Sequence, residues 1–175
     1  HVLQGMGDRV DHILDGGPCR AGIESTIVGW NAEGMGEVYR VGALPLEVLE
    51  GQTRTPWPLH ANNPTQPEAP GATSHHYAPN TPVCCDVPQP GDAWLTWSKR
   101  AADWTGEVGI LHHRLSRTGN LEEAAHNLYA ALIELDGLGV KRICVEAFPQ
   151  EGWGLALGEC IQRASARHTS EASAA

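Results

Sequence analysis

Two stretches of the chain combine polar side chains in a way that could bind a charged ligand. The first, residues 22–28, reads Gly-Ile-Glu-Ser-Thr-Ile-Val and places the hydroxyls of Ser25 and Thr26 shortly after a glycine. Glycine lets backbone N–H groups approach an anion, and the hydroxyls add donors. Arg40, in the next β-branched run, could add a forked cation for phosphate or carboxylate. This combination suits a nucleotide or amino-acid substrate, although a Ser-Thr pair at a strand start is more often part of a turn.

The second stretch closes a proline-rich segment. Residues 51–82 hold seven of the twelve prolines, and each proline fixes φ and removes a backbone donor, so the segment should be stiff and extended. Near its end, residues 69–79 read Ala-Pro-Gly-Ala-Thr-Ser-His-His-Tyr-Ala-Pro and include His76 and Tyr77. The segment is either a lid over a site or a tether whose aromatic tip packs on a neighbour.

Pairs of histidines and cysteines raise the question of a metal site. They lie at His75–His76, Cys84–Cys85 and His112–His113. Adjacent ligands rarely point at one metal without strain, and the spacings of structural zinc sites are missing, so we expect no metal ligands in the chain. The five cysteines are an odd number without a Cys-x-x-Cys motif, which favours reduced thiols in a cytosolic protein.

Composition and charge argue against several other classes. Hydrophobic residues make up 41% of the 175 residues and charged residues 19%, as in a globular protein. The net charge of −9 argues against unspecific nucleic-acid binding, so any contact with RNA or a nucleotide would be local and weak. No apolar run approaches the roughly 18 residues of a membrane span. Because the chain starts with His-Val-Leu-Gln, neither a start methionine nor a signal peptide, we expect a piece of a longer protein.

Strands in the first part of the chain must position the polar residues. Three short apolar or β-branched runs, residues 10–14, 25–28 and 37–40, are bounded by glycine-rich turns and predict strands. Pro45 starts a helical turn that Gly51 should end. Three strands and half a helix are too few for an independent domain, so this part needs the rest of its sheet.

The part after the proline-rich segment alternates between strands and helices. Apolar runs typical of buried parallel strands occur at residues 93–97, 108–111 and 142–145. Helical spacing predicts one helix over residues 121–136 and a second over residues 155–166. Asn120 and Glu123 should form a capping box for the first helix. This order points to a small α/β domain with a parallel sheet, followed by a polar tail that we expect to be disordered.

Three separated stretches together resemble one family, the Sua5-type threonylcarbamoyl-AMP synthases. The Asp-Gly-Gly-Pro-Cys and Gly-Ile-Glu-Ser-Thr-Ile-Val motifs in residues 15–28, with Tyr-Arg-Val-Gly-Ala-Leu-Pro-Leu-Glu at 39–47, resemble the end of its YrdC-like domain. Ala-Pro-Gly and His-Tyr-Ala-Pro in residues 69–79 resemble its linker motif, His-Tyr-x-Pro. Residues 123–136 and 154–164 resemble its C-terminal Sua5 domain. The likeness runs over nearly all of the chain.

The resemblance implies an α/β fold in successive parts. Residues 1–50 would be the C-terminal portion of a YrdC-like catalytic domain, with an incomplete sheet. Residues 51–82 would be the linker, acting as a lid. Residues 83–167 would form a small Rossmann-like α/β domain with a parallel sheet, and residues 168–175 a disordered tail.

The resemblance also implies an enzyme, a cytoplasmic nucleotidyltransferase. Sua5 enzymes join L-threonine, bicarbonate and ATP, with Mg²⁺, into threonylcarbamoyl-AMP and release pyrophosphate. A downstream complex then transfers the threonylcarbamoyl group to adenosine 37 of tRNAs that read codons starting with A. This chemistry needs positioning, charge neutralisation and exclusion of water, which gives a stiff lid a purpose.

Five side chains receive roles from the resemblance. Ser25 would hydrogen-bond substrate, with Thr26 its neighbour in the motif, and Arg40 would hold nucleotide phosphate. His76 and Tyr77 would close the linker over the cleft. The family's Lys-x-Arg strand and Ser-x-Asn motif are not in this chain, so we expect these 175 residues to be inactive alone.

Two other functions stay open. The chain could be a non-catalytic nucleotide-binding or regulatory Sua5-like module, which would still bind nucleotide without residues 1–50. It could also be a purely structural interaction domain that uses its six tryptophans as an interface. That function predicts a stable complex and no change in melting temperature with small molecules.

Overall fold

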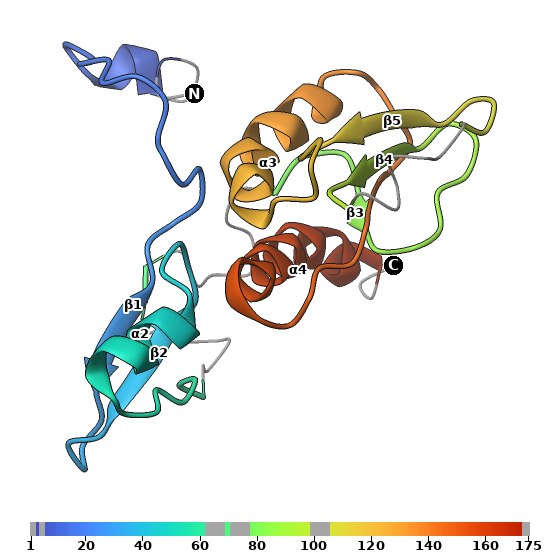
Figure 1. The fold of residues 1–175 in the computed structure, drawn as a ribbon. Coiled ribbons are helices and arrows are strands. Elements are labelled where there is room, and N and C mark those ends of the chain that lie inside the picture. The colour runs from blue at the N-terminus through green and yellow to red at the C-terminus, as the bar shows by residue number, and fades with distance from the viewer. Residues whose placement is uncertain (1–2, 4–5, 62–68, 71–77, 99–105, 173–175) are drawn as a thin grey trace.

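The computed structural model describes residues 3, 6–61, 69–70, 78–98 and 106–172 of the chain. Its elements are a 3₁₀ helix η1 (Gly7–Arg9), β1 (Ile27–Trp30), β2 (Gly36–Arg40), α2 (Leu46–Thr53), β3 (Val83–Cys84), β4 (Ala93–Thr96), β5 (Leu111–Arg114), α3 (Leu121–Asp136), β6 (Ile143–Val145) and α4 (Gly152–Ala172). The strands form a two-stranded sheet, β1 and β2, and a four-stranded sheet. Figure 1 shows β1, β2 and α2 as one part of the molecule and the second sheet, with α3 and α4 beside it, as another.

The first part is built on an antiparallel pair of strands, β1 and β2. Val28 lies opposite Val38 in the register, and the Asn31 side chain closes the loop by accepting two backbone N–H groups. Two of the three predicted strands are therefore confirmed. The strand predicted over residues 10–14 is wrong: this run has no strand partner among the described residues, and Leu14 is exposed.

The start of the proline-rich segment is attached to the edge of β2. The Val38 N–H donates to the Pro58 carbonyl at 2.9 Å, and the His60 N–H donates to the Val38 carbonyl at 2.8 Å. The His60 ring also lies 2.6 Å from the Glu37 carboxylate, measured from Nδ1 to Oε2. An edge strand tolerates prolines because its outer side needs no N–H donors. This stretch is thus extended, as predicted, and fixed to β2.

The second part contains a parallel sheet in the order β3-β6-β4-β5. Helices α3 and α4 pack against the sheet face that carries Val83, Ala93, Leu95, Ile143 and Val145. This confirms the predicted α/β fold with a parallel sheet. The strand expected at residues 108–111 lies three residues later, because Val108 is 97% exposed and Gly109 has a φ of 88° in a turn. Because β5 lies at the edge of the sheet, it can contain the polar residues His112 and His113. These residues do not fit the apolar pattern by which the strand was sought in the sequence.

Helix α3 has the predicted boundaries, Leu121–Asp136. The Asn120 side chain caps it by accepting the Glu123 N–H at 2.9 Å. The return bond of a capping box is absent from the hydrogen bonds of these residues. Instead, the Glu123 carboxylate accepts the Ser116 hydroxyl at 2.6 Å, and the Asn120 N–H donates to that hydroxyl oxygen at 2.9 Å. The Ser116 hydroxyl therefore accepts the Asn120 N–H, the bond that the predicted capping box would give to the Glu123 side chain.

Two helices are longer than predicted. Helix α2 continues past Gly51 to Thr53 and ends where Arg54 adopts the left-handed conformation, with a φ of 55°. Helix α4 extends to Ala172, into the tail expected to be disordered, because no glycine or proline follows Gly158 and alanine favours helix. None of the helices in the described part of the chain is long and apolar enough to cross a bilayer.

Both parts of the molecule share a small apolar core. Val38, Val41 and Trp57 from the first part enclose Ala156, which lies near the start of α4. The Glu47 carboxylate of α2 accepts the Gly152 N–H at 3.0 Å. Helix α4 therefore packs on both sheets and fixes the first part against the second.

Candidate functional site

Ser25 and Arg40, predicted to act together, lie side by side in the structure. Arg40 is the last residue of β2 and lies opposite Ile27 in the register. Its Nε donates to the Ser25 carbonyl at 3.0 Å, and its Nη2 donates to the Ser25 hydroxyl oxygen at 3.2 Å. The antiparallel pairing of β1 and β2 therefore holds the guanidinium against the serine.

The same guanidinium reaches the proline-rich segment. Arg40 Nη1 donates to the Pro70 carbonyl at 2.6 Å, and the neighbouring Ala69 is only 4% exposed. A guanidinium carries five N–H donors, and these contacts use three of them. The other two have no hydrogen-bond partner among the described residues. A cation with two N–H groups that no described residue engages, positioned beside the Ser25 hydroxyl and the Pro70 carbonyl, can bind an anion.

Thr26 has a different environment from Ser25. Its hydroxyl donates to the Leu44 carbonyl at 2.7 Å and accepts N–H groups from Gly42 and Leu44, each at 3.1 Å. A hydroxyl has one donor and two acceptor sites, so these bonds saturate it. The predicted contact between Thr26 and a ligand would require breaking one of them. In the structure Thr26 instead holds the start of β1 against the loop after β2.

The two lid residues, His76 and Tyr77, lie outside the described residues, and their role stays a prediction. The far end of the linker, at residues 80–81, is hydrogen-bonded to the end of α3. The Asp136 carboxylate at the end of α3 accepts the Thr81 N–H at 2.7 Å and both the N–H and the side-chain amide of Asn80 at 3.1 and 3.2 Å. Burial raises the pKa of Asp136, but these hydrogen bonds outweigh burial and the pKa is lowered. The linker is therefore attached at Pro70 on one side and at Asn80 on the other.

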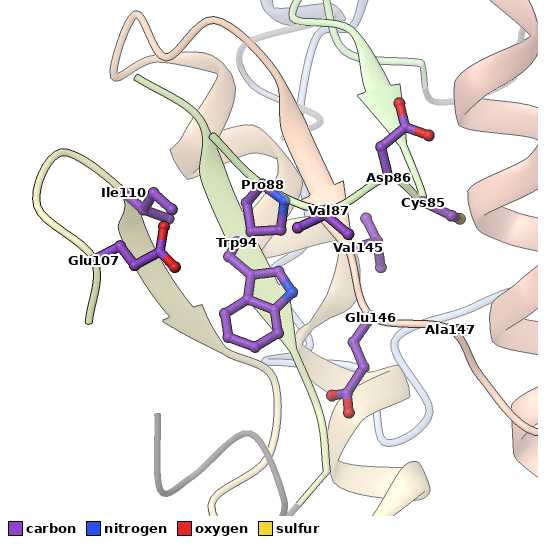
Figure 2. Close-up of a pocket in the computed structure, with 10 residues that line it drawn as sticks. All are labelled: Cys85, Asp86, Val87, Pro88, Trp94, Glu107, Ile110, Val145, Glu146 and Ala147. Atoms are coloured by element: carbon purple, nitrogen blue, oxygen red, sulfur yellow. The ribbon is translucent and has the colours of Figure 1, made fainter. Parts of the chain in front are cut away.

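A separate cavity of about 250 Å³ lies at the parallel sheet, as Figure 2 shows. Its lining includes the Trp94 indole and the carboxylates of Asp86, Glu107 and Glu146. Two of these carboxylates serve the fold: Glu146 accepts the N–H groups of two residues after β4, and Asp86 pairs with Arg142 at 3.3 Å. None of the predicted site residues lines this cavity.

Three contacts of the candidate site were not foreseen from the sequence. Two are backbone carbonyls, those of Pro70 and Leu44, and such groups leave no signal in residue types. The third is the Glu24 side chain, which contacts Tyr129 and Arg163 of the second part. Its place inside the Gly-Ile-Glu-Ser-Thr motif was the only signal that could have identified it.

Comparisons with known proteins agree with this fold and motif order. A family model described as "Threonylcarbamoyl-AMP synthase, C-terminal domain" matches residues 36–166. The chain is 30% identical over 179 residues to the threonylcarbamoyl-AMP synthase of Pyrococcus abyssi and 30% identical over 189 residues to that of Bacillus subtilis. These matches cover 94% of this chain but 52% and 51% of those proteins.

A solved structure gives the same result. The crystal structure of P. abyssi Sua5 complexed with L-threonine superposes with a TM-score of 0.77 and 26% identity, over 94% of this chain and 52% of that one. The chain thus spans about half the length of the curated relatives it matches. Since the family model covers most of its residues, the chain belongs to the family of threonylcarbamoyl-AMP synthase C-terminal domains.

Proposed function

We propose that this chain is the C-terminal part of an L-threonylcarbamoyladenylate synthase, which makes threonylcarbamoyl-AMP from L-threonine, bicarbonate and ATP. The whole protein would work in the cytoplasm and pass its product to the complex that modifies adenosine 37 of tRNA. The observation that carries this proposal is the Arg40 guanidinium, which joins the Ser25 hydroxyl to the Pro70 carbonyl of the linker. Family membership and a relative solved with L-threonine support it.

The geometry suits a reaction between anionic groups. A carbamate formed from threonine and bicarbonate attacks the α-phosphorus of ATP, and pyrophosphate leaves. The two remaining N–H groups of Arg40 would bind phosphate oxygens, while the Ser25 hydroxyl, which accepts from Arg40, still has its own O–H to donate. The linker above them would exclude water, which hydrolyses both the carbamate and the mixed anhydride.

Mg²⁺ would enter this site with the nucleotide. The ion prefers oxygen ligands and is commonly held by a few carboxylates together with substrate phosphates. Ser25 and Arg40 present a hydroxyl and a cation, and no group of three or more potential metal-binding side chains occurs in the described ranges. Ser25 and Arg40 themselves offer no carboxylate, so the roles proposed for them are binding, orientation and exclusion of water.

Substitution of Arg40 in the full-length protein tests this assignment. Arg40→Ala should weaken nucleotide binding about tenfold or more, because hydrogen bonds to a charged group contribute about 1.5–3 kcal/mol. Arg40→Lys should recover only part of the loss, since an ammonium cannot reach Ser25 and Pro70 together. Nucleotide affinity and pyrophosphate release with ATP, threonine and bicarbonate are the measurements.

Arg117→Ala is the matched control, because Arg117 is an exposed arginine far from this site in the sequence. It should leave both measurements unchanged. Unchanged affinity and activity in Arg40→Ala would contradict the site assignment. The 175-residue chain assayed alone should release pyrophosphate only at background level, and robust turnover would show that the proposed dependence on the rest of the protein is wrong.

The alternative of a nucleotide-sensing C-terminal domain is less well supported. The cavity at its parallel sheet is lined by the carboxylates of Asp86, Glu107 and Glu146, and like charges would repel a nucleotide phosphate. Arg40, which has two N–H groups without a partner among the described residues, lies in the first part. Nucleotide binding to residues 83–167 without residues 1–50 would nevertheless favour the alternative, and titration calorimetry can measure it.

A further inference from the structure

A buried polar cluster joins the motif next to Ser25 to the second part of the molecule. The Tyr129 hydroxyl on α3 donates to Glu24 Oε2 at 2.9 Å, and Arg163 Nη2 on α4 lies 3.8 Å from the same oxygen. The side chains of Arg163 and Glu24 are only 12% and 14% exposed. Cys160 completes the cluster, because Arg163 donates to its sulfur at 3.3 Å.

The backbone before Glu24 lies directly on α3. Gly22 has a φ of 71°, and a Cβ built there would come within 2.5 Å of the His126 Cα atom. Ile23 packs against the cores of both parts. The segment is therefore wedged between the two parts of the molecule, and the approach is close enough to require glycine.

Glu24 is also fixed on its other side. Its carbonyl accepts the Ala43 N–H at 2.8 Å, and a Cβ at Gly42 would come within 2.4 Å of that carbonyl oxygen. The next residue, Ser25, is held by Arg40 at both its carbonyl and its hydroxyl. Consecutive residues in an extended chain point in opposite directions, so the carboxylate of Glu24 reaches the second part while the Ser25 hydroxyl meets Arg40.

A carboxylate at position 24 can do more than hold the two parts of the molecule together. A buried ion pair stabilises a fold little compared with apolar residues of the same size, but the hydrogen bond from Tyr129 to Glu24 is directional and fixes the position of the carboxylate. An apolar side chain at position 24 could bury similar area against Tyr129 without fixing the direction of the backbone.

We propose that Glu24 is a positioning residue through which α3 and α4 hold Ser25 in place for substrate binding. The inference rests on the proposed function, and it assigns the C-terminal domain a task beyond anchoring the linker: it is the rigid support behind the substrate-binding serine. Loss of the Tyr129 or Arg163 contact should therefore act on substrate affinity through Ser25.

Epistasis in the full-length protein tests this inference. Tyr129→Phe removes one hydroxyl and keeps the ring, so the variant should fold. Ser25→Ala first identifies the substrate whose KM depends on the serine. Tyr129→Phe should then raise the KM of that same substrate by roughly threefold to tenfold, as expected for one lost hydrogen bond. In the Ser25→Ala background the same substitution should have no further effect on that KM, because the serine it positions is gone. A merely structural contact would change KM equally in both backgrounds.

Tyr39→Phe is the matched control, since it removes the same hydroxyl from a tyrosine of β2, outside this cluster. It should leave KM within about twofold. If Ser25→Ala raises KM but Tyr129→Phe does not, or if Tyr129→Phe acts equally in both backgrounds, the positioning role is wrong while the site assignment stands. If Ser25→Ala itself leaves every KM unchanged, the proposed function of the site fails, and the positioning role fails with it.

Discussion

Ser25 and Thr26 are adjacent hydroxyl residues whose tasks are separated by their hydrogen bonds. The Ser25 hydroxyl accepts one bond, from Arg40, while the Thr26 hydroxyl makes three bonds to the loop after β2. Among the described residues the Ser25 O–H has no acceptor, whereas the donor and both acceptor sites of the Thr26 hydroxyl are used. Under the proposed function, Ser25 binds the ligand, while its neighbour Thr26 supports the loop after β2.

This difference predicts that substitution of Thr26 lowers stability much more than substitution of Ser25. Thr26→Val should lower the free energy of unfolding by about 1–3 kcal/mol, because it leaves the N–H groups of Gly42 and Leu44 without their acceptor. Thr26→Ser should retain most of the stability. Ser25→Ala should change it by less than about 0.5 kcal/mol, since this side chain is exposed. Urea denaturation of the four proteins is the measurement, and equal losses in Thr26→Val and Ser25→Ala would contradict the division of tasks.

At the scale of elements, the linker is placed by its attachments at both ends. Its first residues extend the edge of β2 through Val38, and Pro70 accepts from Arg40. Its last residues bind the carboxylate of Asp136, where α3 ends. The linker residues that the structure describes are therefore attached to both parts of the molecule.

The attachment at Asp136 should depend on pH. Hydrogen bonds from Thr81 and Asn80 outweigh burial and lower the pKa of Asp136 in the folded protein. A lowered folded pKa means that the stabilisation is complete above the unfolded pKa of about 3.9 and is lost as the pH falls through the folded pKa. The stability difference between wild type and Asp136→Asn should therefore be constant from about pH 7 to pH 5 and shrink towards pH 3.

Urea midpoints across this pH range measure that difference. Glu134→Gln, an exposed carboxylate on the same turn of α3, is the control and should show a much smaller difference at every pH. A gap between wild type and Asp136→Asn that does not narrow in acid would show that the carboxylate charge does not hold the linker.

At the scale of the whole molecule, the two parts are joined through residues 22–24 and through α4. Gly22 packs against the backbone of α3, and the Glu24 carboxylate contacts side chains of α3 and α4. Ala156 of α4 packs in the core of the first part. The two-stranded sheet of the first part is thereby supported by the α/β second part. Under the proposed function, the binding residues lie on the first part and the residues that support them lie on the second, so the site depends on both parts.

Gly22→Ala tests how much this joint depends on close approach. The new Cβ would meet the α3 backbone at 2.5 Å, and a helix backbone cannot yield as a flexible side chain does. Gly34→Ala is the matched control, because Gly34 has a similar φ of 77° but a Cβ added there would meet nothing within 4 Å. Gly22→Ala should cost about 1–3 kcal/mol more than the control and speed hydrogen exchange at residues 22–26. Equal effects of the two substitutions would contradict a tight joint.

The sequence by itself determined the features that depend on local interactions. Helix α3 was predicted with its boundaries and its cap at Asn120, because helical periodicity and capping act over a few residues. The α/β class, the strands near residues 25–28 and 37–40 and the family were also predicted, since they follow from the order of such local signals. The pairing of Ser25 with Arg40 was expected from strands that neighbour each other in sequence.

Only the tertiary structure decided what depends on distant residues. The position of β5 was missed because an edge strand is exposed enough to carry histidines, and exposure is set by neighbours elsewhere in the chain. Three hydrogen bonds likewise join residues that are 16 to 105 positions apart in the sequence. They connect Gly42 with Thr26, Arg40 with Pro70, and Tyr129 with Glu24. Residue types record which bonds a side chain can make, but the packing of the whole chain selects the partner.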